Sequence, residues 1–535
     1  MAYKGFLISN YSTGFQTTKE PWISPEDAFV TLENARCIDG ILSKRAGSAH
    51  LAQMNHGGAV QTTTITGLWT HSSKNQHFLL ACDTARPNVY SPETTAMLDV
   101  SGGSDIFSGG AADLFNFMTL HGKTYMTNFQ DTMYMFDGDA FEPSVPTAVS
   151  AMDLTTHATS GAKMNTAHML FFLSDRFLAF DIVDDGTYRP YRLRYSQTLA
   201  WGETPSFQDG NYLDVQSDDK PVAGMRLGRY IYIWFENSLH MLRPSGSTAI
   251  PFRFDYIRGD LGSQTPGVCI PFDKGMMTVG HKDLLYFDGY EVKRMNLPNL
   301  NNILAQFEWS ALKYSWGVFD STNRRVYITF AATGSTYPDR ILEYGITDKV
   351  WAIHKFPVHA LAMYNGAAMP QWDDADAAYA TDGATLAEMP IAGGLDVISE
   401  KAWFPVYGGR DGWLWRMFTG TSDNDVKYDF KAASARLNPF NKIGKRCSLG
   451  RVAVLVDTSA TASFDVKLYK NTSSTAYKTQ TITCTGNSDK HWETLHAGGE
   501  TGDTHQIEFS NDAKANLPVI HATWLEMEPA GHINP

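Results

Sequence analysis

Three short acidic clusters hold the carboxylates that could do chemistry in this chain. They are Trp372-Asp373-Asp374-Ala375-Asp376, Asp184-Asp185-Gly186 and Asp423-Asn424-Asp425. Hydrolysis of a glycosidic bond needs two carboxyl groups at a set separation across that bond, and calcium needs several oxygen ligands. No cluster has the spacing and closing Glu of a calcium loop, and no Ser-x-Asp-x-Gly-x-Thr-Trp repeat typical of sialidases occurs. We interpret the clusters as solvated turns.

Histidine and cysteine spacing is equally uninformative about catalysis. The 16 histidines form no HExxH motif, and the chain has neither a Walker loop nor a GxSxG sequence. The odd number of cysteines and the absence of a CxxC pair favour free buried thiols over a zinc site or disulfides. These cysteines are Cys37, Cys82, Cys269, Cys447 and Cys484. The sequence therefore predicts no catalytic residue, no cofactor and no metal.

A basic segment rich in tyrosine is the remaining candidate site. Arg189, Arg192 and Arg194 lie between Tyr188 and Tyr195, and arginine interleaved with aromatic residues can bind nucleic acid. On a strand, however, Arg192 and Arg194 point to the same face because side chains alternate. That pattern is typical of a solvated or subunit-facing strand, so we favour a subunit contact through Arg189, Arg192 and Arg194.

The elements that would carry these residues are β-hairpins. Leu284 to Phe287 is a short apolar strand followed by Asp288-Gly289, and Tyr134 to Gly138 repeats the pattern. Aromatic residues suit a half-buried strand, and Asp-Gly provides the positive φ of a tight turn.

Weaker copies of this hairpin recur along the chain. Equivalent positions lie 42 to 61 residues apart: Tyr90, Phe136, Phe180, Met241, Phe287, Tyr344 and Leu386. A four-stranded propeller blade takes roughly 40 to 50 residues. We therefore predict an all-β fold with a β-propeller of about seven blades over residues 61–420; the alternative is a run of hairpins in a large sandwich. Trp413-Leu414-Trp415 is expected to close the circle or lead out of it.

The two ends of the chain lack the blade pattern. Residues 1–60 are expected to form an extended leader that docks onto the fold or closes it. Within the leader, Ser24 suits an N-cap and Pro25 suits the first helical position, so we expect a helical turn that continues over residues 28–35. Residues 421–535 contain alternating or apolar strands typical of a small antiparallel sandwich. These strands are Arg451 to Val456, Phe464 to Tyr469, Ile507 to Phe509 and Val519 to Trp524.

The leader also carries a family resemblance. Its pattern is Gly14-Phe15, Ser24-Pro25-Glu26-Asp27-Ala28, Asn34-Ala35-Arg36, Asp39-Gly40-Ile41-Leu42 and Lys44-Arg45-Ala46-Gly47. It resembles the opening segment of the tail hub or nozzle proteins of short-tailed bacteriophages, also called tail tubular protein B or packaged-DNA stabilisation protein. The positions that carry the motif are Asn34, Gly40, Leu42, Arg45 and Gly47. A second similar segment runs from Trp201-Gly202-Glu203-Thr204-Pro205 to Val215.

The resemblance implies a structural role in a virion tail. Members of this family are large propeller subunits that form a hexameric ring below the portal and adaptor, with fibres or a plug or needle at the other end. Double-stranded DNA leaves through the channel without sequence-specific contact. This chain lacks the long inserted domains of some relatives, so any gate built from such insertions is not expected here.

Charge and composition agree with this expectation. The net charge is −13, and nearly all of it lies in residues 61–420. Because an acidic surface repels phosphates, we expect acidic residues to line the channel, with a few basic residues as contact points. No run of 18 apolar residues or signal peptide occurs, so we expect no membrane contact and assembly in the host cytoplasm. The alternative is a propeller that binds or hydrolyses host polysaccharide.

Overall fold

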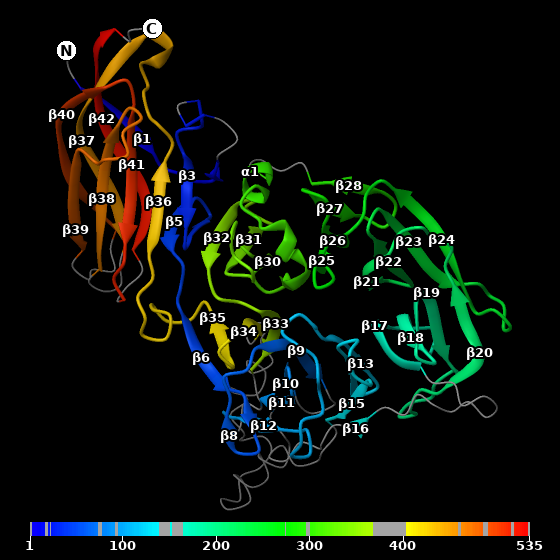
Figure 1. Ribbon diagram of the computed structural model, residues 1–535. Helices are drawn as coiled ribbons and strands as arrows, with labels where there is room; N and C mark the ends of the chain where they lie inside the picture. The colour runs from blue at the N-terminus through cyan, green and yellow to red at the C-terminus, as the bar shows by residue number, and fades with distance from the viewer. Residues whose placement is uncertain are drawn as a thin grey trace, which may run out of the picture.

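The computed structural model describes most of the chain and consists almost entirely of β-strands (Figure 1). The described residues are 3–16, 20–21, 23–72, 77–90, 95–138, 150–151, 164–272, 274–295, 300–366, 403–457, 462–484, 490–514 and 518–532. No helix within these ranges is long and apolar enough to span a membrane. The predicted all-β fold class is confirmed.

Seven four-stranded units follow one another along the chain, and we call them blades one to seven. Blade one is β9 (Ile65–Ser72), β10 (His77–Asp83), β11 (Pro87–Tyr90) and β12 (Met97–Asp99). Blade two is β13 (Asn116–Leu120), β14 (Lys123–Thr127), β15 (Tyr134–Asp137) and β16 (Ser150–Ala151). Blade three is β17 (Met164–Leu173), β18 (Arg176–Asp184), β19 (Thr187–Ser196) and β20 (Phe207–Asp214). Blade four is β21 (Pro221–Leu227), β22 (Tyr230–Phe235), β23 (Ser238–Pro244) and β24 (Phe252–Gly259).

The remaining blades complete the circuit. Blade five is β25 (Cys269–Phe272), β26 (Gly275–Val279), β27 (Leu284–Phe287) and β28 (Val292–Arg294). Helix α1 (Leu300–Leu304) and a 3-10 helix (Trp309–Tyr314) lead to blade six, which is β29 (Gly317–Asp320), β30 (Arg325–Phe330), β31 (Arg340–Gly345) and β32 (Trp351–Lys355). Blade seven is β33 (Ala360–Asn365), β34 (Trp403–Gly408), β35 (Trp413–Met417) and β6 (Ser48–Gln53).

The first strands of the blades form a closed cycle. β9 contacts β13, and the contacts continue through β17, β21, β25, β29 and β33 back to β9. This is the radial arrangement of a β-propeller, which leaves few sheet edges exposed. Close packing at the centre depends on small residues: a Cβ on Gly67 would lie 2.6 Å from Phe115, and one on Gly224 would lie 2.5 Å from Phe171.

Blade seven closes the ring by joining the two parts of the chain. Its outer strand β6 comes from the leader and pairs antiparallel with β35, from Trp413 opposite Gln53 to Met417 opposite Ser48. Of the two alternatives expected for Trp413-Leu414-Trp415, the structure shows the one in which the segment takes part in closing the circle. The predicted boundary between residues 60 and 61 differs from the structure, because β6 is a propeller strand.

The C-terminal segment and the rest of the leader build a two-sheet sandwich. One sheet has the order β4-β5-β42-β37-β40, with β1 also on β42. The other continues from β32 of blade six through β3, β36, β41, β38 and β39, with β2 also on β3. The leader strands are β1 (Lys4–Ile8), β2 (Gly14–Phe15), β3 (Ala28–Glu33), β4 (Ala35–Ile38) and β5 (Ile41–Lys44), followed after β6 by the hairpin β7 (Asn55–His56) and β8 (Ala59–Val60). The C-terminal strands are β36 (Phe430–Ser434), β37 (Lys445–Asp457), β38 (Ala462–Lys470), β39 (Lys478–Cys484), β40 (His491–Gly502), β41 (His505–Asn511) and β42 (Val519–His532), with a 3-10 helix at Asn441–Ile443.

Two local predictions in these segments have different outcomes. The four predicted sandwich strands are confirmed and lie in β37, β38, β41 and β42. The predicted continuation of the helical turn over residues 28–35 is wrong, because Ala28–Glu33 is strand β3. Phe29, Val30 and Thr31 favour a strand, and the pairing of Phe29 with Ser434 provides one. Tertiary pairing outweighs the capping signal here.

One blade assignment needs correction, and another is not tested. Phe180 lies in the second strand of blade three, whereas Phe136 and Phe287 lie in third strands; the equivalent third strand is β19. The assignment of residues 377–386 to a hairpin lies outside the described residues.

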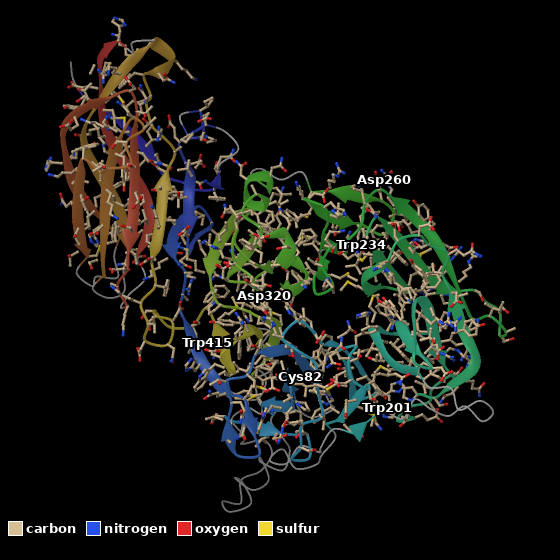
Figure 2. All side chains as sticks on the ribbon, in the orientation of Figure 1. Cys82, Trp201, Trp234, Asp260, Asp320 and Trp415 are labelled. Carbon is tan, nitrogen blue, oxygen red and sulfur yellow. The ribbon has the colours of Figure 1, made fainter. Side chains whose placement is uncertain are left out.

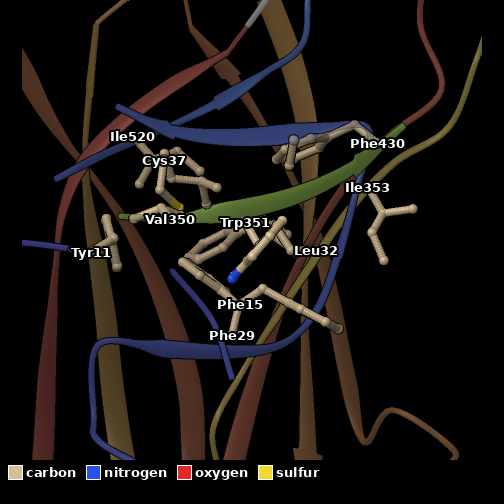
Figure 3. Packing of buried hydrophobic residues seen from close by; sticks show 14 of the residues in the cluster. Tyr11, Phe15, Phe29, Leu32, Cys37, Val350, Trp351, Ile353, Phe430 and Ile520 are labelled. Atoms are coloured by element: carbon tan, nitrogen blue, oxygen red, sulfur yellow. The ribbon is translucent and has the colours of Figure 1, made fainter. Parts of the chain in front are cut away.

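A single apolar core runs through the junction of the two units (Figure 3). It joins Phe29 and Leu32 of the leader, Trp351 and Ile353 of blade six, and Phe430 of the sandwich. Because all these side chains are buried, the two units cannot separate without exposing apolar surface to water.

Candidate functional site

The leader residues that carry the family motif gather at the joint between the propeller and the sandwich. Asn34 has a positive φ of 51°, and its backbone N–H donates to the carbonyl of Ile353 at 2.9 Å. Its side-chain oxygen accepts the N–H of Lys355 at 2.9 Å and Nε of Arg45 at 3.0 Å. Its Nδ2 donates to the carbonyl of Asp429 at 2.7 Å. One asparagine therefore connects blade six, the leader and the sandwich.

Arg45 is a fully buried cation of this joint. Its Nη1 and Nη2 donate to the two carboxylate oxygens of Asp423 at 2.9 and 2.7 Å. Its guanidinium carbon lies 3.9 Å from the ring centre of Phe356 and 3.8 Å from that of Tyr428. Nε donates to Asn34. Bidentate pairing and aromatic stacking are the two interactions that lysine cannot reproduce, so the site is specific for arginine.

The other three motif residues serve backbone geometry and packing. Gly40 has φ +74° in the turn between β4 and β5, and a Cβ there would lie 2.0 Å from Oδ1 of Asn10. Leu42 is fully buried in the sandwich core. A Cβ on Gly47 would lie 2.0 Å from the carbonyl oxygen of Ser422, so only glycine lets the leader pass this close to the propeller exit.

A second buried ionic network fixes blade six to the leader. The Glu343 carboxylate is fully buried and lies 2.8 Å from Nη2 of Arg36, 2.5 Å from Nη1 of Arg325 and 2.6 Å from Nε2 of His354. Arg325 also pairs with Asp348 at 3.1 Å. Burial opposes ionisation of Glu343, but Arg36, His354 and Arg325 together hold its pKa below the usual range. The sequence analysis did not identify Glu343. A lone carboxylate inside the apolar strand Arg340–Gly345 was the only signal.

Two buried histidines make folding sensitive to acid. Burial lowers the pKa of both His354 and His359 from 6.5 to about 4. Between these values the unfolded chain binds protons that the folded chain does not, so stability falls as the pH falls from 6.5 towards 4. We expect each histidine to remove about 2 kcal/mol of unfolding free energy between pH 6.5 and 5.

Denaturant unfolding at several pH values measures this effect. His359→Gln should reduce the loss between pH 6.5 and 5 by the contribution of one histidine, about 2 kcal/mol, since His359 no longer titrates. His281→Gln, at an exposed position, is the control and should leave the loss unchanged. An identical pH dependence in all three proteins would contradict the assignment.

The three arginines predicted as a subunit contact lie in blade three and differ from one another. Arg192 and Arg194 share one face, as predicted, because both pair with Asp184, at 3.4 and 2.7 Å. Arg192 also pairs with Asp214 at 2.8 Å. Arg194 is buried inside its own blade, so it offers almost no surface to a partner. Arg189 is exposed, and a subunit contact stays a prediction for Arg189 and Arg192.

Two of the three acidic clusters lie in the described ranges, and one aspartate of each pairs with arginine. Asp184 is held by two arginines, and Asp423 binds Arg45 and, at 3.0 Å, the hydroxyl of Ser48. Both are structural counter-ions of arginine. The cluster at residues 372–376 lies outside the described residues. Within the described ranges, no three His, Cys, Asp or Glu side chains are grouped as metal ligands.

The five cysteines and the second family-like segment are the remaining features that the sequence analysis singled out. All five cysteines are free, as predicted; Cys269 is half-buried and the others are buried. In the second segment, Phe207 is fully buried, whereas Trp201 is 65% exposed. The Trp201 ring lies 4.8 Å from that of His121, so a loop of blade three covers a turn of blade two. Figure 2 marks Trp201 at the periphery of the ring.

Comparison with known proteins gives a likeness of architecture alone. No family model and no curated protein matches the chain. Among solved structures, the extracellular domain of a one-component system from B. thetaiotaomicron is 10% identical, with a TM-score of 0.35 over 59% of this chain and 36% of that chain. PorZ of the type-IX secretion system of Porphyromonas gingivalis is 9% identical, with a TM-score of 0.33 over 85% and 46%. An exo-β-1,3-galactanase from Phanerochaete chrysosporium is 9% identical, with a TM-score of 0.27 over 90% and 100%. The chain thus spans less than half the length of the first two.

Proposed function

We propose that this chain is a structural subunit of the tail hub or nozzle of a short-tailed bacteriophage, without enzymatic activity. The observation that carries the proposal is the position of the family motif. Asn34, Arg45 and Gly47 are the residues that bond or closely pack the leader against both the propeller and the sandwich. A part of a DNA-ejecting tail has to transmit force between its ends, and a buried joint of this kind resists shear.

The architecture supports assembly into a ring. The closed cycle of blades removes most free sheet edges, which limits uncontrolled strand pairing between copies. In the proposed hexamer, one end binds the portal and adaptor and the other binds fibres or a plug or needle protein. Double-stranded DNA is retained before infection and passes through the channel during ejection. The contact between copies should bury more than about 2,000 Å².

Native mass spectrometry and negative-stain electron microscopy of the purified chain test this function. We expect a closed ring at six times the chain mass, alone or after addition of the portal and adaptor complex. Gold-labelled antibody to the chain should mark the tail of the virion. A monomer under both conditions, with no label on virions, would overturn the proposal.

The polysaccharide-directed alternative predicts a different result. A hydrolase would release sugar from host envelope, and replacement of a single aspartate would abolish that release. The described candidates Asp184 and Asp423 are both held by arginine, which is why we favour the structural role. Sugar release by the purified chain would establish the alternative.

A further inference from the structure

Blade four differs in charge from the rest of the molecule. Residues 221–259 contain five arginines and two carboxylates in a chain of net charge −13. Blade three, residues 164–214, contains four basic and seven acidic residues, and blade five, residues 269–294, contains four of each. A net positive blade therefore sits between an acidic and a neutral one, on the side of the ring away from the sandwich (Figure 1).

Four of the five arginines lie at one end of blade four. Strand pairing matches Leu227 with Tyr230 across the first hairpin and Arg243 with Arg253 across the last. Tyr230 precedes Ile231, which pairs with Leu242, so Tyr230 and Arg243 are also neighbours across the sheet. We call this end, with Arg226, Arg229, Tyr230, Arg243 and Arg253, the blade-four rim.

Most of the positive charge of the rim is uncompensated. Arg226 donates to the backbone carbonyls of Gly228 at 3.1 Å and Phe172 at 3.4 Å, which hold the side chain without neutralising it. Arg229 is exposed. Asp255 is the acidic partner of both Arg243 and Arg253, the latter at 3.6 Å. Among the residues that the structure describes, Asp255 is thus the one carboxylate that pairs with any of these four guanidinium groups.

Exposed aromatic side chains flank these cations. Tyr230 is 37% exposed, and Tyr290, at the tip of the neighbouring hairpin of blade five, is 93% exposed. The Tyr230 ring lies 6.5 Å from that of Tyr232, and Tyr290 lies in the turn that follows β27 of blade five. Tyr232 packs on Phe287 of blade five at 4.7 Å between ring centres. The two exposed tyrosines therefore lie on either side of the contact between blades four and five.

Hydrogen bonds and ion pairs within the blade-five hairpin hold the Tyr290 turn in place. Oδ1 of Asp288 accepts the backbone N–H groups of Tyr290 and Glu291, both at 2.9 Å. Lys293 lies 2.9 Å from Asp288 and 3.5 Å from Glu291, so the acidic residues of the turn have their own counter-ion. Gly289 adopts φ +97°. A fixed turn thus presents an aromatic ring to solvent beside an array of arginines.

We propose that the blade-four rim is a sequence-independent binding surface for the phosphate backbone of double-stranded DNA. Guanidinium groups pair with phosphate oxygens through charge-assisted hydrogen bonds, and tyrosine hydroxyls also bind phosphates. Anion binding follows from the charges of the rim, whereas the choice of DNA rests on the proposed function. Since the chain as a whole has a net charge of −13 and so repels DNA overall, the net positive rim is the place where contact is favoured. This arrangement guides the duplex without gripping it along its length.

Fluorescence anisotropy with a mixed-sequence 30-base-pair duplex, titrated at several KCl concentrations, tests the proposal. Each phosphate contact contributes about −0.9 to the slope of log K against log salt. The triple variant Arg226→Ala, Arg229→Ala and Arg253→Ala should reduce the slope by about 2 to 3 and weaken binding at 50 mM KCl about tenfold or more. The control Lys313→Ala, Lys442→Ala and Lys478→Ala removes the same charge from exposed positions elsewhere and should leave both values unchanged.

Each other outcome has a defined meaning. Equal losses in the two triple variants, or no binding by the native chain, would overturn the rim as a DNA site. Binding of dextran sulfate but not of DNA would assign the rim to an anionic polysaccharide instead. Loss of ring assembly in the rim variant, with DNA binding intact, would make it a contact between copies. Ring formation in virions without DNA binding would refute the rim as a DNA site but not the proposed function. DNA binding by a chain that is absent from virions would refute the proposed function but not the rim.

Discussion

Replacing Arg45 with alanine is expected to lower the free energy of unfolding by about 3 to 5 kcal/mol. The substitution removes both donors from the Asp423 carboxylate and the Nε donor from Asn34. It also leaves a gap between the rings of Phe356 and Tyr428. The Asp423 side chain is 21% exposed and, among the described residues, keeps only the Ser48 hydroxyl as a side-chain donor, so most of its desolvation penalty is no longer offset and the loss exceeds that of a surface pair. Guanidinium chloride unfolding followed by tryptophan fluorescence measures the change.

The same experiment separates a charge effect from an effect of shape. Arg45→Lys keeps the positive charge but cannot form two parallel bonds or stack as a flat group, and should retain a loss of at least about 2 kcal/mol. Arg189→Ala removes an exposed arginine and should change stability by less than about 0.5 kcal/mol. Limited proteolysis of the Arg45→Ala protein should release the sandwich from the propeller. Full stability of Arg45→Lys would show that charge alone matters at the joint.

Local signals were sufficient to predict most of the propeller. Phe136 and Phe287 were placed correctly because each lies in an aromatic strand that precedes Asp-Gly, although only Gly289 of the two glycines adopts the positive φ expected of a tight turn. Phe180 was placed one strand too early because β17 and β18 are both rich in Phe and Leu. Composition distinguishes a strand from a turn, but it does not show which of the four strands of a blade a segment forms.

Long-range pairing was beyond the reach of the same signals. Nothing in Ser48–Gln53 specifies that it pairs with Trp413–Met417 more than 350 residues later. Ala28–Glu33 likewise becomes a strand because β36 and β32 lie beside it. Closing a loop of that length carries an entropic penalty that only the completed ring and its core offset.

The candidate site was predictable only in part, for a similar reason. Asn34, Arg45 and Gly47 were singled out through a resemblance, and the structure explains each by what it touches. Glu343 and the arginines of blade four carried no motif. Their significance depends on burial for Glu343 and on strand register for Arg243 and Arg253. A charge count made blade by blade, instead of over the whole middle segment, would have found the rim.

Replacing Glu343 with glutamine should produce the second large loss, about 3 to 5 kcal/mol of unfolding free energy. Glutamine keeps the volume, so no cavity forms, but Arg36 and Arg325 lose the carboxylate that both pair with. Arg325 retains Asp348 at 3.1 Å, whereas, among the described residues, Arg36 retains only neutral partners, the Tyr327 hydroxyl at 3.4 Å and the Phe418 ring at 3.7 Å. The cost therefore falls mainly on Arg36, which links the leader to blade six. Denaturant unfolding at pH 7 measures it.

Glu33 provides a matched control for this substitution in the same part of the molecule. It also has two basic partners, Lys355 at 2.6 Å and Arg340 at 3.7 Å, but its side chain is 32% exposed whereas that of Glu343 is fully buried. Water screens the partners of Glu33, so Glu33→Gln should lower stability by less than about 1 kcal/mol. The two variants differ in burial and not in the change of charge. Equal losses would mean that charge balance, rather than desolvation, governs the joint, and the explanation given for Arg45 would fail with it.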